Sequence, residues 1–181
     1  MTAYIIILVL LSALFHAFWN YLSKISYSPQ LFFAWIAVVN LVISILIFLA
    51  WPPVIPSSVW VYIIGSAIVH FFYLASLSQA YTSGEISYVY PIARSAPGLI
   101  PIFSVLILDE KISLQGVLGI SCTLVSVYMF IQPGELYTLP KLLEYLKKPE
   151  AIWSFSTLAT VTAYSILDKK GMTEFYNEVG D

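Results

Sequence analysis

The sequence predicts an all-α integral membrane protein, a polytopic bundle of about six transmembrane helices. Of its 181 residues, 60% are hydrophobic and only 10% are charged, whereas a soluble domain carries about 25% charged residues. The apolar residues lie in blocks of about 17–25 residues, the length that a helix needs to cross a bilayer. These blocks lack the alternation of barrel strands, so helices are the structure that satisfies their backbone groups in lipid.

Six blocks fall in this range, at residues 3–22, 31–51, 59–80, 86–108, 114–131 and 151–167. No Lys or Arg precedes the first block and no small-residue cleavage site follows it, so it is read as a retained helix. Prolines end the second block, and Ser113 is placed to cap the fifth. The sixth block is short and rich in Ser and Thr. The polar segment before it, residues 132–150, has room for an interfacial helix at residues 140–147.

Composition and motifs exclude several function classes. The formal net charge of −2 argues against a nucleic-acid partner. The sequence has no phosphate-binding glycine loop, no HExxH or CxxC motif and no paired carboxylates, so we expect neither an enzyme nor a bound cofactor. Two histidines on separate blocks make a poor metal site without a third ligand. The single cysteine, Cys122, lies in an apolar block and is expected to be a buried thiol.

The fourth block contains the most informative residue, Arg94, within the stretch YVYPIARSAPGLIPIF. An arginine at the centre of a spanning helix costs about 2.5–3.5 kcal/mol on insertion scales, so other groups must stabilise it. The surrounding prolines and glycine predict a kinked helix that lines a cavity. The candidate hinge residues are Pro91, Pro97, Gly98 and Pro101.

Three partners for the Arg94 guanidinium remain open. Backbone carbonyls freed by the prolines would hold it as a structural clamp. A carboxylate from a partner chain would form an ion pair with it, and an anionic substrate would accept two hydrogen bonds from it. We favour a cavity or substrate site, because ionisable residues inside a membrane usually serve function.

Polar and aromatic residues on the first, third and fourth blocks form a set of candidates for substrate binding, in an interior hollow that the first four blocks are expected to enclose. The set consists of Arg94, Tyr90, His16, Asn20, Trp19, His70 and Tyr73. His16 and Asn20, His70 and Tyr73, and Tyr90 and Arg94 are pairs three or four residues apart that each share a helix face, and Trp19 flanks the face of the first pair. If these faces turn inward together, they form a chamber for an amphipathic molecule with an anionic end and an apolar or aromatic body. The alternative is helix packing through interhelical hydrogen bonds, which we favour for Asn40 and Ser44 of the second block.

Small residues form a stripe along the fifth block, at Gly116, Gly119 and Thr123. Small side chains let membrane helices approach closely. The stripe therefore predicts a helix-packing face, either within the chain or between two copies in a homodimer.

An internal repeat is suggested by a shift of 146 residues. With this shift, Ala13, Ala17 and Lys24 match Ala159, Ala163 and Lys170. Five blocks separate the two starts, and five is odd, so a second copy would enter the membrane in the opposite sense. This is the inverted-repeat plan of many secondary transporters.

Three stretches carry a resemblance to a known family: HAFWNYLSK in the first block, AYTSGEISYVYPIARSAPGLIPIF around the fourth, and LDEKISLQGVLGISCTLVSVYMF across the fifth. In order and spacing they resemble the EamA branch of the drug/metabolite transporter superfamily. The resemblance implies a ten-span fold of two inverted halves around a central cavity. This chain would hold one five-span repeat (residues 1–131), a connecting segment (132–150) and the start of a second, incomplete repeat (151–181).

The resemblance implies secondary transport of small polar or amphipathic metabolites by alternating access, in the cell (inner) membrane of a prokaryote. The expected partners are the lipid bilayer, a small-molecule substrate, and a second copy or a second transporter half. An alternative stays open because the chain covers little more than one repeat. It would then be a truncated, non-transporting fragment or an assembly subunit that needs a partner chain.

Overall fold

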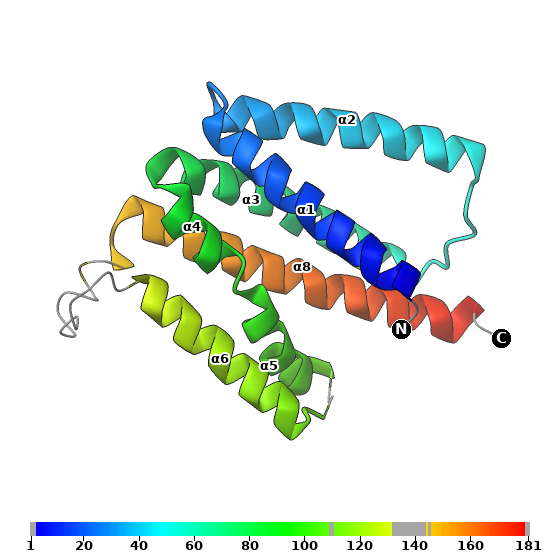
Figure 1. The fold of residues 1–181 in the computed structure, drawn as a ribbon. Coiled ribbons are helices and arrows are strands. Elements are labelled where there is room, and N and C mark those ends of the chain that lie inside the picture. The colour runs from blue at the N-terminus through cyan, green and yellow to red at the C-terminus, as the bar shows by residue number, and fades with distance from the viewer. Residues whose placement is uncertain (1–2, 109–110, 132–143, 145, 180–181) are drawn as a thin grey trace.

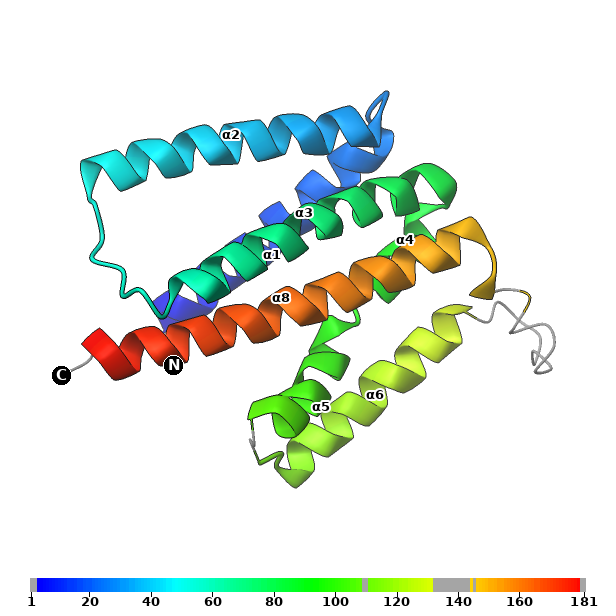
Figure 2. The same cartoon turned by 180° about the vertical axis from the view of Figure 1, so that it is seen from behind.

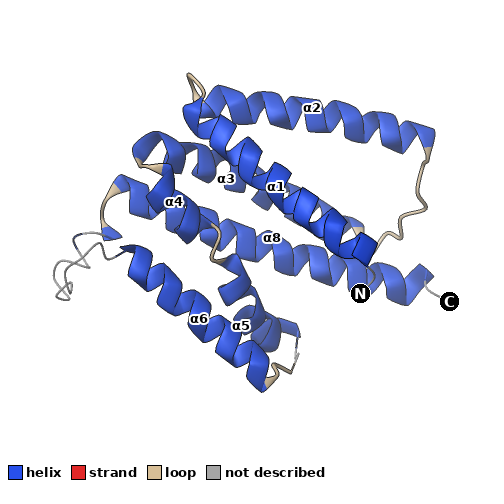
Figure 3. Cartoon of the chain, viewed as in Figure 1, coloured by secondary structure: helices blue, strands red, loops and turns tan. Residues whose placement is uncertain are grey.

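Helices make up all the regular structure in the part of the chain that the computed structural model describes, residues 3–108, 111–131, 144 and 146–179 (Figure 3). The helices are α1 (Ala3–Ile25), α2 (Pro29–Ala50), α3 (Trp60–Ser83), α4 (Ile86–Ala93), α5 (Ala96–Leu108), α6 (Leu114–Ile131) and α8 (Pro149–Val179). The predicted all-helical class is confirmed. The interfacial helix predicted at 140–147 falls largely outside the described residues.

Four stretches are long and apolar enough to cross a membrane: Tyr4–Ile25, Pro29–Ala50, Trp60–Ser83 and Ile86–Leu108. A shorter apolar helix covers Leu114–Met129. These five correspond to the first five predicted blocks. The sixth block was predicted to end at residue 167, but α8 continues to Val179 and is 31 residues long.

Helix α8 runs through the middle of the molecule, beside α3 over most of its length (Figures 1 and 2). The two helices are antiparallel, since Gly171 near the end of α8 lies next to Tyr62 at the start of α3, whereas Gly84 after the end of α3 lies next to Glu150 at the start of α8. Between these points the Ser66 hydroxyl donates a hydrogen bond to the Asp168 carboxylate. This central position explains the polar composition that made the sixth block look weak. Three of its Ser and Thr side chains, Ser154, Thr157 and Thr162, are buried against other helices instead of facing lipid.

The buried hydroxyl groups of α8 all have hydrogen-bond partners. Ser154, Thr157 and Thr162 are almost fully buried, and each donates a hydrogen bond to a carbonyl of its own helix four residues earlier. Short side chains that bond to their own backbone leave room for a neighbouring helix to approach closely. At Gly171 an added Cβ would lie 2.9 Å from the Tyr62 Cβ, which marks a point of close α3–α8 contact.

Helices α1 and α2 form an outer pair on one side of α3 (Figure 1). Most of their side chains are exposed, as lipid-facing surfaces are. Asn40 and Ser44 are exposed too, so they do not pack against another described helix, and their role in helix packing stays a prediction. One end of α1 is fixed to α3, because the Lys24 ammonium donates hydrogen bonds to the carbonyls of Tyr81 and Gly84. A cation at the C-terminus of a helix is favoured by the helix dipole.

The fourth block is two helices instead of one. Helix α4 ends at Ala93, α5 begins at Ala96, and the two segments are not collinear (Figure 1). Pro97 explains the break, because its ring lacks an N–H and would clash with the carbonyl of Ala93 in a continuous helix. In the first turn of α5 the same proline is tolerated. Pro91 and Pro101 lie inside helices that continue through them.

Candidate functional site

Arg94 lies at the break between α4 and α5. It is the C-cap residue of α4, with φ −97° and ψ 5°, and its backbone N–H donates to the carbonyl of Tyr90. This bridge region of backbone conformation is sparsely populated and often holds functional residues. Arg94 thus lies at a helix end, where the series of backbone hydrogen bonds is interrupted between α4 and α5.

The Arg94 guanidinium contacts three neutral groups. Its Nη2 donates to Asn20 Oδ1 at 3.3 Å and to Tyr73 Oη at 3.2 Å. Its Cζ lies 5.7 Å from the centroid of the Tyr90 ring, a cation–π contact. Four of the predicted site residues, from α1, α3 and α4, therefore lie together in one network.

Asn20 connects α1 to Arg94 and to Tyr81 of α3. Its side chain is completely buried, and Oδ1 also accepts a hydrogen bond of 2.7 Å from the Tyr81 hydroxyl. Its Nδ2 donates to the carbonyl of His16 at 2.6 Å. A buried amide must have partners for both its ends, and this arrangement provides them. Asn20 is therefore held in one orientation, with its oxygen toward Arg94.

The positive charge of Arg94 is not neutralised within the described part of the chain. Its hydrogen-bond partners there are a neutral amide and a neutral hydroxyl, and no described carboxylate forms an ion pair with it. Its Nε is buried without a hydrogen-bond partner among the described residues. The proline-freed carbonyls, one of the three partners considered from the sequence, do not accept from it.

Two of the predicted residues, Trp19 and His16, lie on α1 beside Asn20, whereas His70 of α3 lies against α8. The Trp19 indole N–H donates to His16 Nδ1 at 3.3 Å on α1, beside Asn20. His70 is exposed, and its ring lies against Tyr164 of α8 with centroids 4.0 Å apart. His70 reaches the network only through Tyr73, at a centroid distance of 5.7 Å. The seven candidates therefore form two groups, which meet at Tyr73.

A pocket of about 410 Å³ lies beside Arg94, between the α4–α5 break and α6. It is lined by Pro91, Arg94, Ser95, Cys122, Thr123, Ser126 and Val127. The chamber predicted from the sequence was enclosed by the first four blocks. The pocket differs from it, because one wall belongs to α6, from the fifth block.

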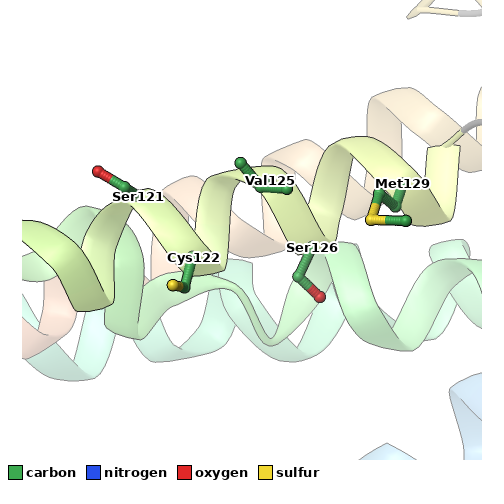
Figure 4. A pocket seen from close by; sticks show the side chains of 5 residues that line it. All are labelled: Ser121, Cys122, Val125, Ser126 and Met129. Carbon is green, nitrogen blue, oxygen red and sulfur yellow. The ribbon is translucent and has the colours of Figure 1, made fainter.

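Cys122 and Ser126 form part of the α6 wall. In Figure 4 both point to the side of α6 on which the α4–α5 segment lies, whereas Ser121 and Val125 point the other way. These residues and Met129 line a second, adjoining hollow of about 560 Å³. Cys122 was expected to be buried, but it is exposed. The expectation failed because an apolar helix has an exposed face even inside a membrane.

Three hydroxyls line the pocket, and two already donate to backbone. Ser95 donates to the Ile92 carbonyl at 2.8 Å, and Thr123 donates to the Gly119 carbonyl at 3.0 Å. The Ser126 hydroxyl makes no hydrogen bond to a described residue. Arg94 and Ser126 therefore supply the side-chain donors that remain for a ligand.

Close contact between α5 and α6 depends on Gly98. A Cβ added there would lie 2.8 Å from Thr123 Cγ2, so Gly98 and Thr123 form the packing contact beside the pocket. The rest of the predicted stripe behaves differently. An added Cβ at Gly119 would meet no described residue within 4 Å, and one at Gly116 would meet Ile112 of the preceding turn. The homodimer reading of the stripe stays a prediction.

Two aromatic residues of the site were missed by the sequence reasoning. Tyr81 donates to Asn20, and Tyr164 packs on His70 and Tyr73. Tyr81 could have been found, because it lies eight residues after Tyr73 and therefore on the same face of α3. No comparable signal pointed to Tyr164. Among the described residues, no group of three His, Cys, Asp or Glu side chains could hold a metal ion.

Comparisons with known proteins give the family. Residues 3–132 match the EamA-like transporter family, a region that contains α1 to α6 and hence Arg94 with its pocket. Neither the curated proteins nor the solved structures yield a match. Because the matched region is well over half of the chain, this protein belongs to the EamA-like transporter family.

Proposed function

We propose that the protein is a secondary transporter that moves small polar or amphipathic metabolites by alternating access, with the Arg94 pocket on the substrate path. Membership of the family supports transport as the general role. Discontinuous helices at membrane depth supply substrate sites in several transporter folds, because their free ends offer polar groups. The α4–α5 break is such a discontinuity, and it carries the one arginine of the chain.

The observation that carries the proposal is that the Arg94 guanidinium has hydrogen-bond partners on one side and an open pocket on the other. On one side it is held by the neutral oxygens of Asn20 and Tyr73. It also borders a pocket, where its charge has no described counterion. A clamp that served structure alone would need no adjoining space, whereas a binding group needs both a fixed orientation and an open side.

Movement in the proposed cycle would occur at the break. Gly98 contacts Thr123 of α6, and Pro97 prevents α4 and α5 from forming one helix. A change in the angle between α4 and α5 would move the pocket wall relative to Arg94. In this proposal Pro97 and Gly98 are the hinge, and Pro91 and Pro101 stiffen the two segments that meet there.

The test is transport by the full chain in sealed vesicles. Vesicles are incubated with a defined mixture of small carboxylates, sugars and amines, and the trapped compounds are identified by mass spectrometry. The wild type should accumulate one or more compounds above empty vesicles, and Arg94→Gln should lose that accumulation. Lys111→Gln is the matched control, because Lys111 is an exposed cation in the segment just before α6, outside the pocket. Equal accumulation by wild type and Arg94→Gln would remove Arg94 from the mechanism.

A second candidate is supported by a groove between α5 and α8. This groove of about 670 Å³ is almost entirely apolar, with Lys170 the one charged residue among those that line it. An unfilled apolar groove along two helices would suit a segment of a partner chain, so the protein would act as an assembly subunit. Crosslinking in native membranes distinguishes the two functions. A crosslinked partner, together with no accumulation by the isolated chain in vesicles, would favour the subunit.

A further inference from the structure

The charge of the Arg94 pocket limits the ligand that it can hold. Arg94 is the only charged residue among those that line the pocket. Its Nη2 carries both hydrogen bonds to Asn20 and Tyr73 and its Nε is buried, so the N–H donors of Nη1 are the ones that remain for a ligand. Together with the Ser126 hydroxyl, these donors suit one group that bears acceptor oxygens.

We propose that the pocket binds one monovalent oxyanion, a small monocarboxylate, and discriminates against dianions of similar shape. The inference rests on the proposed transport function for its biological meaning, although it concerns binding alone. A monocarboxylate bound to Arg94 makes a neutral pair. A dianion would leave one uncompensated negative charge in a low-dielectric site, and no other cation lines the pocket to reduce that cost.

The shape of the pocket sets an upper size. Its volume of about 410 Å³ is near the small end of the range for ligand sites, about 300–1,000 Å³. Pro91 and Val127 give it apolar walls, while Ser95 and Thr123 present hydroxyl oxygens whose hydrogens already point to backbone carbonyls. These oxygens repel an anion, so the carboxylate is directed to the side of Arg94 and Ser126. The apolar part of the ligand then contacts Pro91 and Val127.

Cys122 makes the proposal measurable without transport. It is the one cysteine of the chain, it is exposed, and it lines the same pocket as Arg94. A ligand bound at Arg94 would therefore shield the Cys122 thiol from a water-soluble reagent. Modification by neutral N-ethylmaleimide, followed by mass spectrometry of the full chain, reports the occupancy of the pocket.

The experiment compares three ligands of matched shape at equal ionic strength near neutral pH: benzoate, its dianionic analogue phthalate, and neutral benzamide. Benzoate at ten times its Kd should slow modification of the wild type about tenfold, as mass action requires. Phthalate and benzamide should have much weaker effects at the same concentration. Equal protection by phthalate, or a thiol that the reagent does not reach, would overturn the proposal.

Two variants and one control locate the effect. Arg94→Gln should abolish protection by benzoate, and Lys111→Gln should retain it. Because Arg94→Gln could also disturb folding, Asn20→Asp provides a second route. It places a carboxylate at the position from which Asn20 Oδ1 already contacts Arg94 at 3.3 Å, so the arginine becomes paired internally and protection should be lost. Protection that survives in both variants would refute the role of Arg94.

Failure of this inference and failure of the transport function give different results. Protection of Cys122 without accumulation in vesicles would leave the monocarboxylate site standing and refute transport by the isolated chain. Accumulation without protection, or accumulation of dianions in preference to monoanions, would refute the inference and leave transport standing.

Discussion

Replacement of Gly98 by alanine tests the contact that forms one wall of the pocket. Gly98 is buried, and an added Cβ would lie 2.8 Å from Thr123 Cγ2 and 3.0 Å from Thr123 Cβ. Ordinary carbon–carbon contacts are about 3.5–4.0 Å, so α5 and α6 would have to separate by several tenths of an ångström. Gly119→Ala is the matched control, because no described residue lies within 4 Å of its new methyl group.

The magnitude follows from two opposing terms. Overpacking of a well-packed contact costs about 1–3 kcal/mol. Alanine also gains up to about 1 kcal/mol over glycine in a helix interior, and this gain applies to both variants. We therefore expect Gly98→Ala to lower the free energy of unfolding by about 1–3 kcal/mol relative to Gly119→Ala.

The assay is unfolding of the full chain in mixed micelles by SDS titration, followed by circular dichroism. Thr123→Ser removes the closest methyl group and should recover part of the loss in the double variant with Gly98→Ala, with a coupling of about 0.5 kcal/mol or more. The same separation would widen the pocket, so protection of Cys122 by benzoate should weaken. Equal unfolding midpoints for Gly98→Ala and Gly119→Ala would refute the reasoning.

Two further predictions concern the polar contacts that fix α1 to α3. Lys24→Met removes charge-assisted hydrogen bonds to the carbonyls of Tyr81 and Gly84, each worth about 1.5–3 kcal/mol. It should therefore clearly lower the SDS concentration at the unfolding midpoint. A change no larger than that of exposed Lys111→Met would contradict this. Tyr81→Phe removes the 2.7 Å hydrogen bond to Asn20 Oδ1 and should cost about 1 kcal/mol in the same titration. An unchanged midpoint would mean that the buried Asn20 oxygen needs only Arg94.

The helical blocks could be read from the sequence because their signal is local. An apolar run of spanning length is the same in any context, since lipid demands internal backbone pairing everywhere. The sixth block was read less well. Its Ser and Thr side chains lower its hydropathy, and the sequence does not say that Ser154, Thr157 and Thr162 face other helices. The length of α8 was missed for a different reason. Its last turns, after residue 167, carry charged residues, so the apolar block ends before the helix does.

The candidate site could be predicted only in part. Arg94 was found because a cation among prolines conflicts with an apolar block, and such conflicts between local rules mark functional positions. Asn20 and Tyr73 were found through helical spacing, and they do contact it. His70 was placed with them on the same argument, yet it is exposed and packs on Tyr164. Spacing identifies a face of a helix, but not the direction in which that face points.

The sequence by itself determined that this chain is a helical membrane protein, that its fourth block is interrupted, and that Arg94 needs polar partners there. These features follow from interactions within one segment or between the segment and lipid. Only the tertiary structure decided which helices meet. It put α8 in the centre, joined Asn20 to Tyr81 and Arg94, and opened the Arg94 pocket toward Cys122 on α6. The physical reason is that contacts between helices depend on how side chains fit at close approach, as Gly98 and Thr123 do. The apolar pattern of one helix fits many partners equally well.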